Sequence, residues 1–184
     1  MGTLLSSVRS LSGEGNELLG QKAPAWDVSR WINGNPGSLE SLKGKVVLVR
    51  WWVDECAFCK ASSTSLNKLH KTYHDQGLRV IGMYHLKPAP GPVSTSMVEA
   101  AAGALGFSFS IGVDDEWTNL KRWWFPNGEK RDYTSVSFIL DKEGIIRYVH
   151  PGPEFHEDQI KGHESCNRDY KKIEGMIKQL LFEN

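Results

Sequence analysis

The chain has 184 residues, 40% hydrophobic and 24% charged, which is long enough for one globular domain with a sizeable core. Lysine plus arginine equals aspartate plus glutamate at 22 each, so no net charge favours binding to nucleic acid or to an anionic membrane. Three cysteines are too few for a disulfide-stapled scaffold, and no apolar run is long enough to cross a bilayer.

Residues 1–19 are rich in serine, glycine and leucine, and we interpret them as a flexible lead-in to a single domain over residues 20–184. They lack a basic start followed by an unbroken apolar stretch, so no secretory signal is visible. This favours the cytoplasm, with the periplasm or secretion as the alternatives if a leader has been removed. Prolines and glycines over residues 20–42 predict an extended segment with a turn.

The next segments predict a β-α-β unit. Residues 45–52 are apolar and β-branched, which is typical of a buried strand. Residues 60–76 carry apolar side chains on one helical face, and residues 78–85 predict a second buried strand. A strand, a helix and a strand in this order predict a parallel, right-handed crossover.

The remaining elements follow in chain order. We expect a loop over 87–92, a helix over 93–105, a strand over 109–113, a helix over 116–124, a β-hairpin of 136–140 with 145–149, and a final helix over 167–182. The order predicts an α/β fold, with a central mixed β-sheet, helices on both faces and an inserted α/β segment between the β-α-β unit and the hairpin.

Two cysteines separated by two residues, Cys56 and Cys59, lie where the first predicted strand meets the helix. A cysteine at a helix N-terminus faces unpaired backbone N–H groups and the positive end of the helix dipole, and both favour the thiolate. A second thiol one turn further on can attack a mixed disulfide formed at the first. The motif therefore indicates thiol–disulfide chemistry. The alternatives are a structural disulfide or half of a zinc site, although no second Cys-x-x-Cys completes a four-cysteine site.

Element order and motif together resemble the thioredoxin fold, in its redoxin or TlpA-type thiol–disulfide oxidoreductase branch, which is related to AhpC/TSA. The resemblance covers residues 20–152. It is carried by the Ala-Pro-Ala-Trp at 23–26, by the approach to the strand at 39–49, by Trp-Trp-Val-Asp-Glu-Cys-Ala-Phe-Cys at 51–59, and by Phe-Ile-Leu-Asp at 138–141 with the turn at Gly144.

The resemblance implies a thioredoxin-like three-layer fold and an enzyme in which Cys56 is the nucleophile and Cys59 resolves the mixed disulfide. It implies no cofactor other than the redox-active Cys56–Cys59 disulfide. The expected partners are disulfide-containing proteins or small thiol substrates, together with an electron donor or acceptor such as a thioredoxin system, and no nucleic acid.

Three residues are candidates for the substrate-binding groove around the sulfurs: Trp52, Thr134 and Ser135. Ser135 departs from the family pattern, which places a cis-proline three residues before the hairpin phenylalanine. In the family that proline helps to bind substrate backbone and keeps metals away from the thiols.

Charged residues around the motif are expected to tune the thiol pKa. Arg50 and Lys60 favour the thiolate of Cys56, whereas Asp54 and Glu55 oppose it. Arg50 stands where thioredoxin has a buried acid that serves as proton acceptor, so that role does not carry over.

Two further functions are alternatives. A thiol-dependent peroxidase of the peroxiredoxin type carries a proline seven residues and a threonine three residues before its cysteine, and here those positions are Val49 and Val53. A metal-binding or metal-delivery protein on the same fold would use His156, His163 and Cys166. Their spacing matches no known metal motif. We therefore assign no metal site and interpret the segment as a solvated loop.

Overall fold

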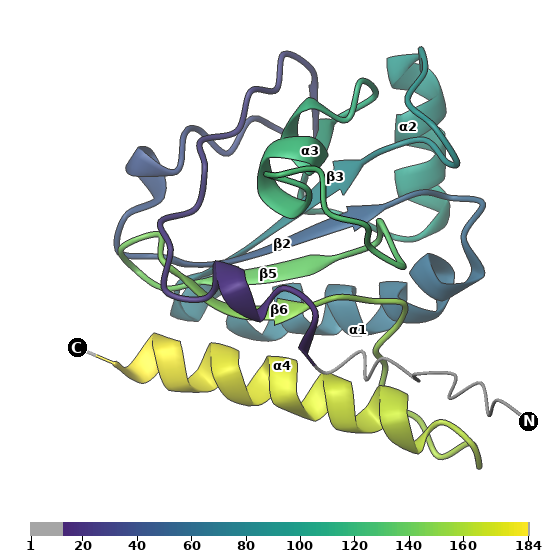
Figure 1. Cartoon of the computed structure of the whole chain (residues 1–184). Coiled ribbons are helices and arrows are strands. Elements are labelled where there is room, and N and C mark those ends of the chain that lie inside the picture. The colour runs from purple at the N-terminus through teal and green to yellow at the C-terminus, as the bar shows by residue number, and fades with distance from the viewer. Residues whose placement is uncertain (1–12, 184) are drawn as a thin grey trace, which may run out of the picture.

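The computed structural model describes residues 13–183, and a six-stranded mixed sheet forms its centre (Figure 1). The strands are β1 (Trp31–Ile32), β2 (Val46–Trp52), β3 (Leu78–Tyr84), β4 (Ser110–Val113), β5 (Ser137–Leu140) and β6 (Ile146–His150). The helices are α1 (Ala57–Tyr73), α2 (Thr95–Ala104), α3 (Thr118–Trp124) and α4 (Glu164–Phe182), with single 3-10 turns at Asn16–Leu18, Glu40–Leu42 and His74–Gln76. The spatial order of the strands is β1-β4-β3-β2-β5-β6.

Strand β2 lies at the centre of this sheet. It pairs in parallel with β3, as the β-α-β prediction requires, and antiparallel with β5. The predicted hairpin is confirmed by the antiparallel pairing of β5 with β6. The inserted segment supplies α2 and β4, and β4 extends the parallel part of the sheet beside β3.

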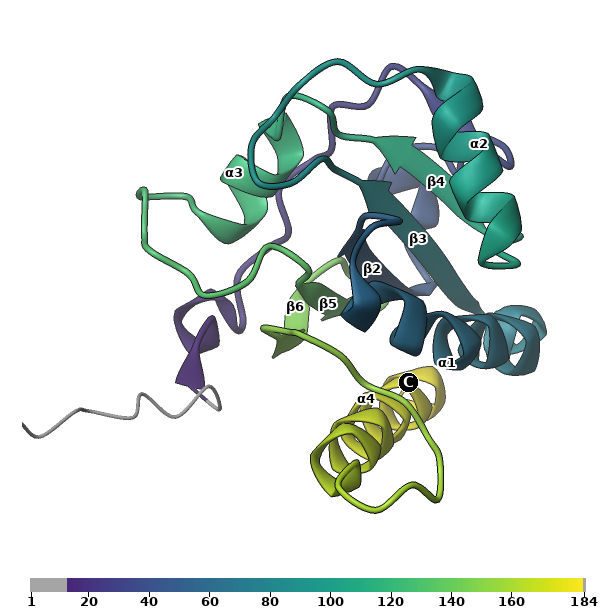
Figure 2. The ribbon, with the colours of Figure 1, turned by 90° about the vertical axis from the view of Figure 1, so that its right-hand side faces the viewer.

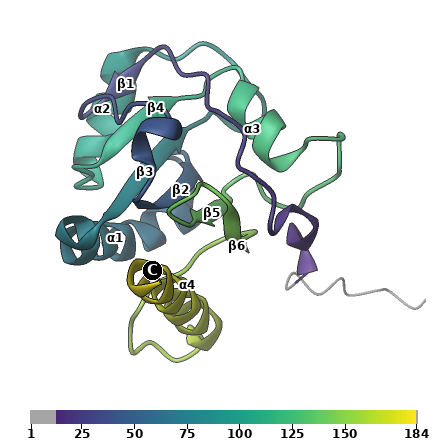
Figure 3. The same cartoon turned by 90° about the vertical axis from the view of Figure 1, so that its left-hand side faces the viewer.

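Alternate side chains of β2 supply the two cores, because successive residues of a strand point to opposite faces. Val46, Leu48 and Trp52 belong to the core covered by α1, α2 and α4. Val49 and Trp51 belong to the core on the other face, covered by α3 and the N-terminal segment. Figures 2 and 3 show α1 and α4 below the sheet and α3 on the opposite side. The predicted α/β architecture with helices on both faces is confirmed.

Asp114, which directly follows β4, connects α3 to the sheet through hydrogen bonds. Its carboxylate is 3% exposed and accepts hydrogen bonds from the backbone N–H groups of Asn119 (2.9 Å) and Leu120 (2.8 Å). The indole N–H of Trp51 on β2 donates to the same carboxylate at 3.0 Å. One buried acid therefore caps a short helix and ties it to the central strand.

The structure differs from the sequence prediction mainly at short elements and at helix starts. The two-residue strand β1 lies within the segment predicted as merely extended, where Trp31 pairs with Gly112. Helix α1 begins at Ala57 rather than residue 60, and α4 begins at Glu164 rather than residue 167. Helix ends are the part of a pattern that periodicity defines least.

The predicted lead-in falls only partly within the described residues, because residues 1–12 lie outside them. Within the rest, Leu18 packs into the core on the α3 face and is 5% exposed. Gly15 has φ +87°, and its backbone lies so close to the domain that a Cβ there would be 2.8 Å from side-chain atoms of Trp124 and Val149. Residues 15–18 are thus docked on the domain. Within residues 13–183, no helix combines the length and the apolar character needed to cross a membrane.

Candidate active site

The two cysteines of the motif lie at the carboxyl end of β2, where the chain turns into α1. Cys56 is the N-cap of α1, with extended φ and ψ of −90° and 113°. Its carbonyl accepts hydrogen bonds from the N–H groups of Cys59 (3.0 Å) and Lys60 (3.1 Å), which starts the helix. Both thiols are free. Cys56 is partly exposed and Cys59 is 2% exposed. A substrate can therefore reach the first sulfur and not the second.

The environment separates the pKa values of the two thiols. A hydrogen bond from the Cys59 side chain is the largest influence lowering the pKa of Cys56, to about 5, and it outweighs the opposing effect of burial. The backbone N–H groups of Cys59 and Phe58 and the charge of Lys87 lower it further. The same hydrogen bond, followed by burial, raises the pKa of Cys59. At neutral pH the pair is therefore a Cys56 thiolate beside a Cys59 thiol.

Lys87 is a site residue that the sequence analysis missed. It follows β3, and its Nζ lies 3.9 Å from Sγ of Cys56 and 2.8 Å from Oγ of Ser135. Strands β2 and β3 are parallel, with Trp52 opposite Tyr84, so their carboxyl ends meet at the same edge of the sheet. The predicted parallel crossover was therefore enough to find Lys87. Its identification required the inference that the loop after residue 85 lies beside the cysteines.

Ser135 lies directly against the second cysteine. Its Oγ is 3.2 Å from Sγ of Cys59, and the Ser135 side chain is almost fully buried. The neighbouring Thr134 is half-buried and its Oγ1 lies 2.8 Å from Nε2 of His85. Burial is the main cause that lowers the pKa of His85 to about 3, so this imidazole is neutral. The loop before β5 thus brings a hydroxyl to the buried thiol.

Arg50 is the buried cation of the site and is 1% exposed. Its guanidinium donates to the carbonyls of Ser135 (2.6 Å) and Pro153 (2.7 Å) and to Oγ of Ser137 (3.2 Å). Burial lowers the pKa of Arg50, while the charges of the two cysteines raise it. Its positive charge in turn lowers the pKa of Cys59, against the larger effects that raise it. A buried guanidinium stays protonated, so it is a fixed positive charge near the sulfurs.

The other candidates lie further from the sulfurs or away from solvent. Trp52 is 1% exposed and packs edge-on against Tyr84 and Phe107, so it supports the site from the core and offers no surface to a substrate. The side chains of Glu55 and Lys60 are exposed and make no hydrogen bond or ion pair within residues 13–183. The exposed ring beside Cys56 is that of Phe58, which is 41% exposed and meets Tyr133 edge-on at a centroid distance of 6.4 Å.

The three metal-ligand candidates lie in and next to the segment between β6 and α4. His156 and His163 meet around Asp158, which the sequence analysis did not include. Cys166 instead lies against Glu154, with Sγ 3.5 Å from its Oε1. The candidate set is therefore divided between two groups that share His156.

Comparison with known proteins is consistent with a dithiol site. Residues 19–149 match the sequence model of the AhpC/TSA family. Protein DipZ of Mycobacterium tuberculosis is 29% identical over 160 residues, which are 84% of this chain and 20% of DipZ, so the chain spans about a fifth of that relative. The thiol:disulfide interchange protein DsbE of Escherichia coli is 27% identical over 161 residues, covering 78% of this chain and 72% of DsbE.

Solved structures resemble this chain over most of its length. The crystal structure of a thiol:disulfide interchange protein of the thioredoxin family from Chlorobium tepidum superposes with a TM-score of 0.63 at 18% sequence identity. The match covers 88% of this chain and 97% of the other. This likeness shows the thioredoxin fold, as the sequence resemblance implied.

Proposed function

The chain belongs to the AhpC/TSA family, and on this basis we propose that it is a thiol–disulfide oxidoreductase whose Cys56–Cys59 pair exchanges with disulfides. The observation that carries the proposal is the pairing of a partly exposed thiolate with a buried thiol at one helix N-terminus. The resemblance to a thiol:disulfide interchange protein supports the same reaction class. The substrates we infer are disulfide-containing proteins or small disulfides, because the partly exposed Cys56 can be reached from solvent.

In the first step the Cys56 thiolate attacks one sulfur of the substrate disulfide. A bond forms between that sulfur and Sγ of Cys56, the substrate S–S bond breaks, and the departing thiolate takes a proton from water. The hydrogen bond from Cys59 does most to keep Cys56 ionised below neutral pH, and the cation of Lys87, 3.9 Å from Sγ, adds to it. The step removes the negative charge from Cys56. Lys87 therefore affects the free energy of the Cys56 thiolate before the reaction and the fraction of Cys56 that is ionised.

In the second step Cys59 gives its proton to water and its sulfur attacks Sγ of Cys56. The Cys56–Cys59 bond forms, the mixed disulfide breaks, and the reduced substrate leaves as a thiolate that is protonated by solvent. Two electrons have then passed from the dithiol to the substrate. Ser135 and Arg50 are the groups that can stabilise the Cys59 thiolate, through a 3.2 Å contact and through a buried positive charge. A dithiol donor, such as a thioredoxin system, must return the electrons.

Peroxidase chemistry has less support at this site. The position three residues before Cys56 is Val53, which is 4% exposed and has no hydroxyl to hold a peroxide. Disulfide exchange involves no peroxide, so it does not need that hydroxyl.

Reduction of insulin disulfides in the presence of dithiothreitol tests the proposal. We expect Cys56→Ser to abolish the catalysed rate, and Cys59→Ser to accumulate a mixed disulfide between Cys56 and substrate that is visible by mass spectrometry without reductant. Cys166→Ser is the matched control, because its sulfur lies beside Glu154 outside the pair, and it should retain the wild-type rate. Loss of activity in both variants without a trapped adduct in Cys59→Ser would contradict the assigned roles.

A further inference from the structure

A second cluster of reactive side chains lies outside the dithiol, in the loop between β6 and α4. Within residues 13–183, two groups of three histidine, cysteine or acidic residues have ligand atoms within 4.8 Å of one another: Glu154, His156 and Cys166, and His156, Asp158 and His163. The proposed disulfide exchange uses none of these residues. Phe155 fastens the start of the loop to α1, because its N–H donates to Oγ of Ser62 at 3.1 Å.

The second group converges on one carboxylate oxygen. Oδ2 of Asp158 lies 2.7 Å from Nδ1 of His163 and 3.0 Å from Nδ1 of His156. The two imidazole rings face each other edge-on with centroids 4.8 Å apart. Ligand atoms bound at 2.0–2.1 Å around one tetrahedral zinc ion are separated by about 3.3 Å. Small movements of the three side chains would therefore make room for an ion between them.

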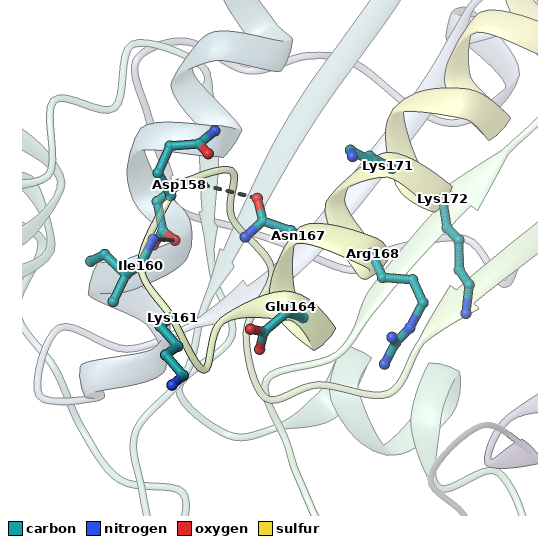
Figure 4. A pocket seen from close by; sticks show the side chains of 9 residues that line it. Asp158, Ile160, Lys161, Glu164, Asn167, Arg168, Lys171 and Lys172 are labelled. Carbon is teal, nitrogen blue, oxygen red and sulfur yellow. Dashed lines mark hydrogen bonds between the residues drawn. The ribbon is translucent and has the colours of Figure 1, made fainter.

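The backbone around Asp158 holds this carboxylate in place. Its N–H donates to Oδ1 of Asn167 on α4 at 3.0 Å, as Figure 4 shows, and its own Oδ1 accepts the N–H of Ile160 at 3.0 Å. The N–H of His163 donates to the carbonyl of Ile160 at 3.2 Å. These hydrogen bonds connect residues of the loop to one another and to α4, and they therefore hold the two imidazoles at the carboxylate.

His156 connects the two groups through its two ring nitrogens. Its side chain is 8% exposed, with Nδ1 toward Asp158 and Nε2 toward Glu154, whose Oε2 lies 3.8 Å away. Metal-binding histidines commonly direct the second nitrogen at a carboxylate, which fixes the ring and increases its basicity. Glu154 supplies such a carboxylate, and Sγ of Cys166 contacts its other oxygen, Oε1, at 3.5 Å. The thiol is therefore not aimed at the Asp158 group.

We propose that His156, Asp158 and His163 form a binding site for a divalent late transition metal, with zinc as the ion expected. Two imidazole nitrogens and one carboxylate match the ligands that zinc takes, whereas calcium and magnesium require oxygen ligands. Three protein ligands leave the fourth tetrahedral position to water or to an external ligand. The groove beside the loop, about 700 Å³ and lined by Lys161, Arg168 and Lys171 among others, is open to solvent (Figure 4).

Zinc titration by calorimetry tests the site in the full chain carrying Cys56→Ser and Cys59→Ser, so that the dithiol cannot bind the ion. We expect one zinc per chain in this background. We expect His163→Ala and Asp158→Asn each to weaken binding by about tenfold or more, since even residues that only orient ligands contribute that much. His163 is the safer variant for folding because its side chain is 37% exposed.

His74→Ala is the matched control, because His74 is an exposed histidine that lies next to a carboxylate, Asp75, at the C-terminal end of α1. It should leave zinc affinity unchanged, and so should Cys166→Ser. Substitution of cobalt for zinc gives a second readout, and the spectrum should lack a sulfur-to-cobalt charge-transfer band. Absence of stoichiometric zinc binding, equal loss in His74→Ala, or a charge-transfer band that disappears in Cys166→Ser would each overturn the assignment. None of these outcomes bears on the proposed disulfide exchange, which is tested separately with the wild-type protein.

Discussion

Removal of the positive charge at Lys87 should raise the pKa of Cys56 by an amount that the geometry fixes. Two unit charges 3.9 Å apart interact by about 1 kcal/mol in water and about 4 kcal/mol at an effective dielectric constant of 20. Lys87 is exposed, so the lower value applies. One pKa unit corresponds to about 1.4 kcal/mol, which gives a rise of about 0.8 units for Lys87→Ala.

The rate of alkylation of Cys56 by iodoacetamide, followed by mass spectrometry as a function of pH, measures this pKa directly. The rate rises with pH as the thiolate forms, and its midpoint should move from about 5 in the wild type to about 6 in Lys87→Ala. Lys87→Arg keeps the charge and should keep the wild-type midpoint. In 1 M salt, where the screening length is about 3 Å, the difference between wild type and Lys87→Ala should shrink.

Lys60→Ala is the decisive comparison. Lys60 lies in the first turn of α1, directly after the motif, and within residues 13–183 its exposed ammonium makes no hydrogen bond to either sulfur. We expect its removal to leave the midpoint where it is. An unchanged midpoint in Lys87→Ala, or an equal shift in Lys60→Ala, would refute the assignment of Lys87 as the cation of Cys56.

Three other substitutions have defined outcomes. Ser135→Ala removes the hydroxyl beside Cys59 and should slow release of reduced substrate from the mixed disulfide by about tenfold in stopped-flow experiments, since a hydrogen bond to a charged group contributes about 1.5 kcal/mol. Arg50→Met leaves three buried acceptors without a donor and should lower the free energy of unfolding by about 3 kcal/mol or more in urea. Asp114→Ala removes the cap of α3 and should cost about 2 kcal/mol in the same assay, with little change in alkylation of Cys56.

The fold was predictable where a pattern repeats over many residues. The six apolar residues of the seven-residue strand β2 and the apolar face of α1 are such patterns, and their ends were wrong by a few residues at most. Strand β1 was missed because two residues carry no period. Trp31 and Ile32 form a strand only because β4 lies beside them, which is a property of the tertiary structure.

Whether a site residue could be predicted also depended on whether its contacts are local or distant in the chain. Cys56 and Cys59 could be identified because their environment, a strand that turns into a helix, is local in the chain. The cation is not local, since Lys87 is 31 residues from Cys56 in sequence and 3.9 Å away in space. Sequence proximity instead selected Lys60, whose side chain the helix directs to solvent. Charges one residue from a cysteine are therefore poorer guides to its pKa than the ends of neighbouring parallel strands.

The two cations also bear on the direction in which the dithiol transfers electrons. Lys87 reaches the exposed sulfur and Arg50 lies buried near the other, and the acceptors that bind Arg50 are neutral carbonyls and a hydroxyl. Both charges favour thiolates, and a thiolate exists only in the reduced form. Stabilisation of the reduced form makes a disulfide more oxidising. The site should therefore be a stronger oxidant than one of the same fold with neutral residues at these two positions.

The pKa of Cys56, which the hydrogen bond from Cys59 lowers most and Lys87 lowers further, sets how strongly the reduced form is stabilised. A thiol with a pKa of about 5, compared with about 7 in thioredoxin, favours the reduced form at neutral pH by about 2.3 kcal/mol, or about 50 mV. Partial exposure of Cys56 screens the charges and halves this to about 25 mV above the thioredoxin value of about −270 mV. Equilibration with glutathione at several pH values measures it. The potential should fall by about 30 mV per pH unit above the Cys56 pKa, where one proton accompanies two electrons, and by about 59 mV per unit below it. A potential at or below that of thioredoxin, with no break in slope near pH 5, would show that the site does not stabilise the Cys56 thiolate as the geometry indicates.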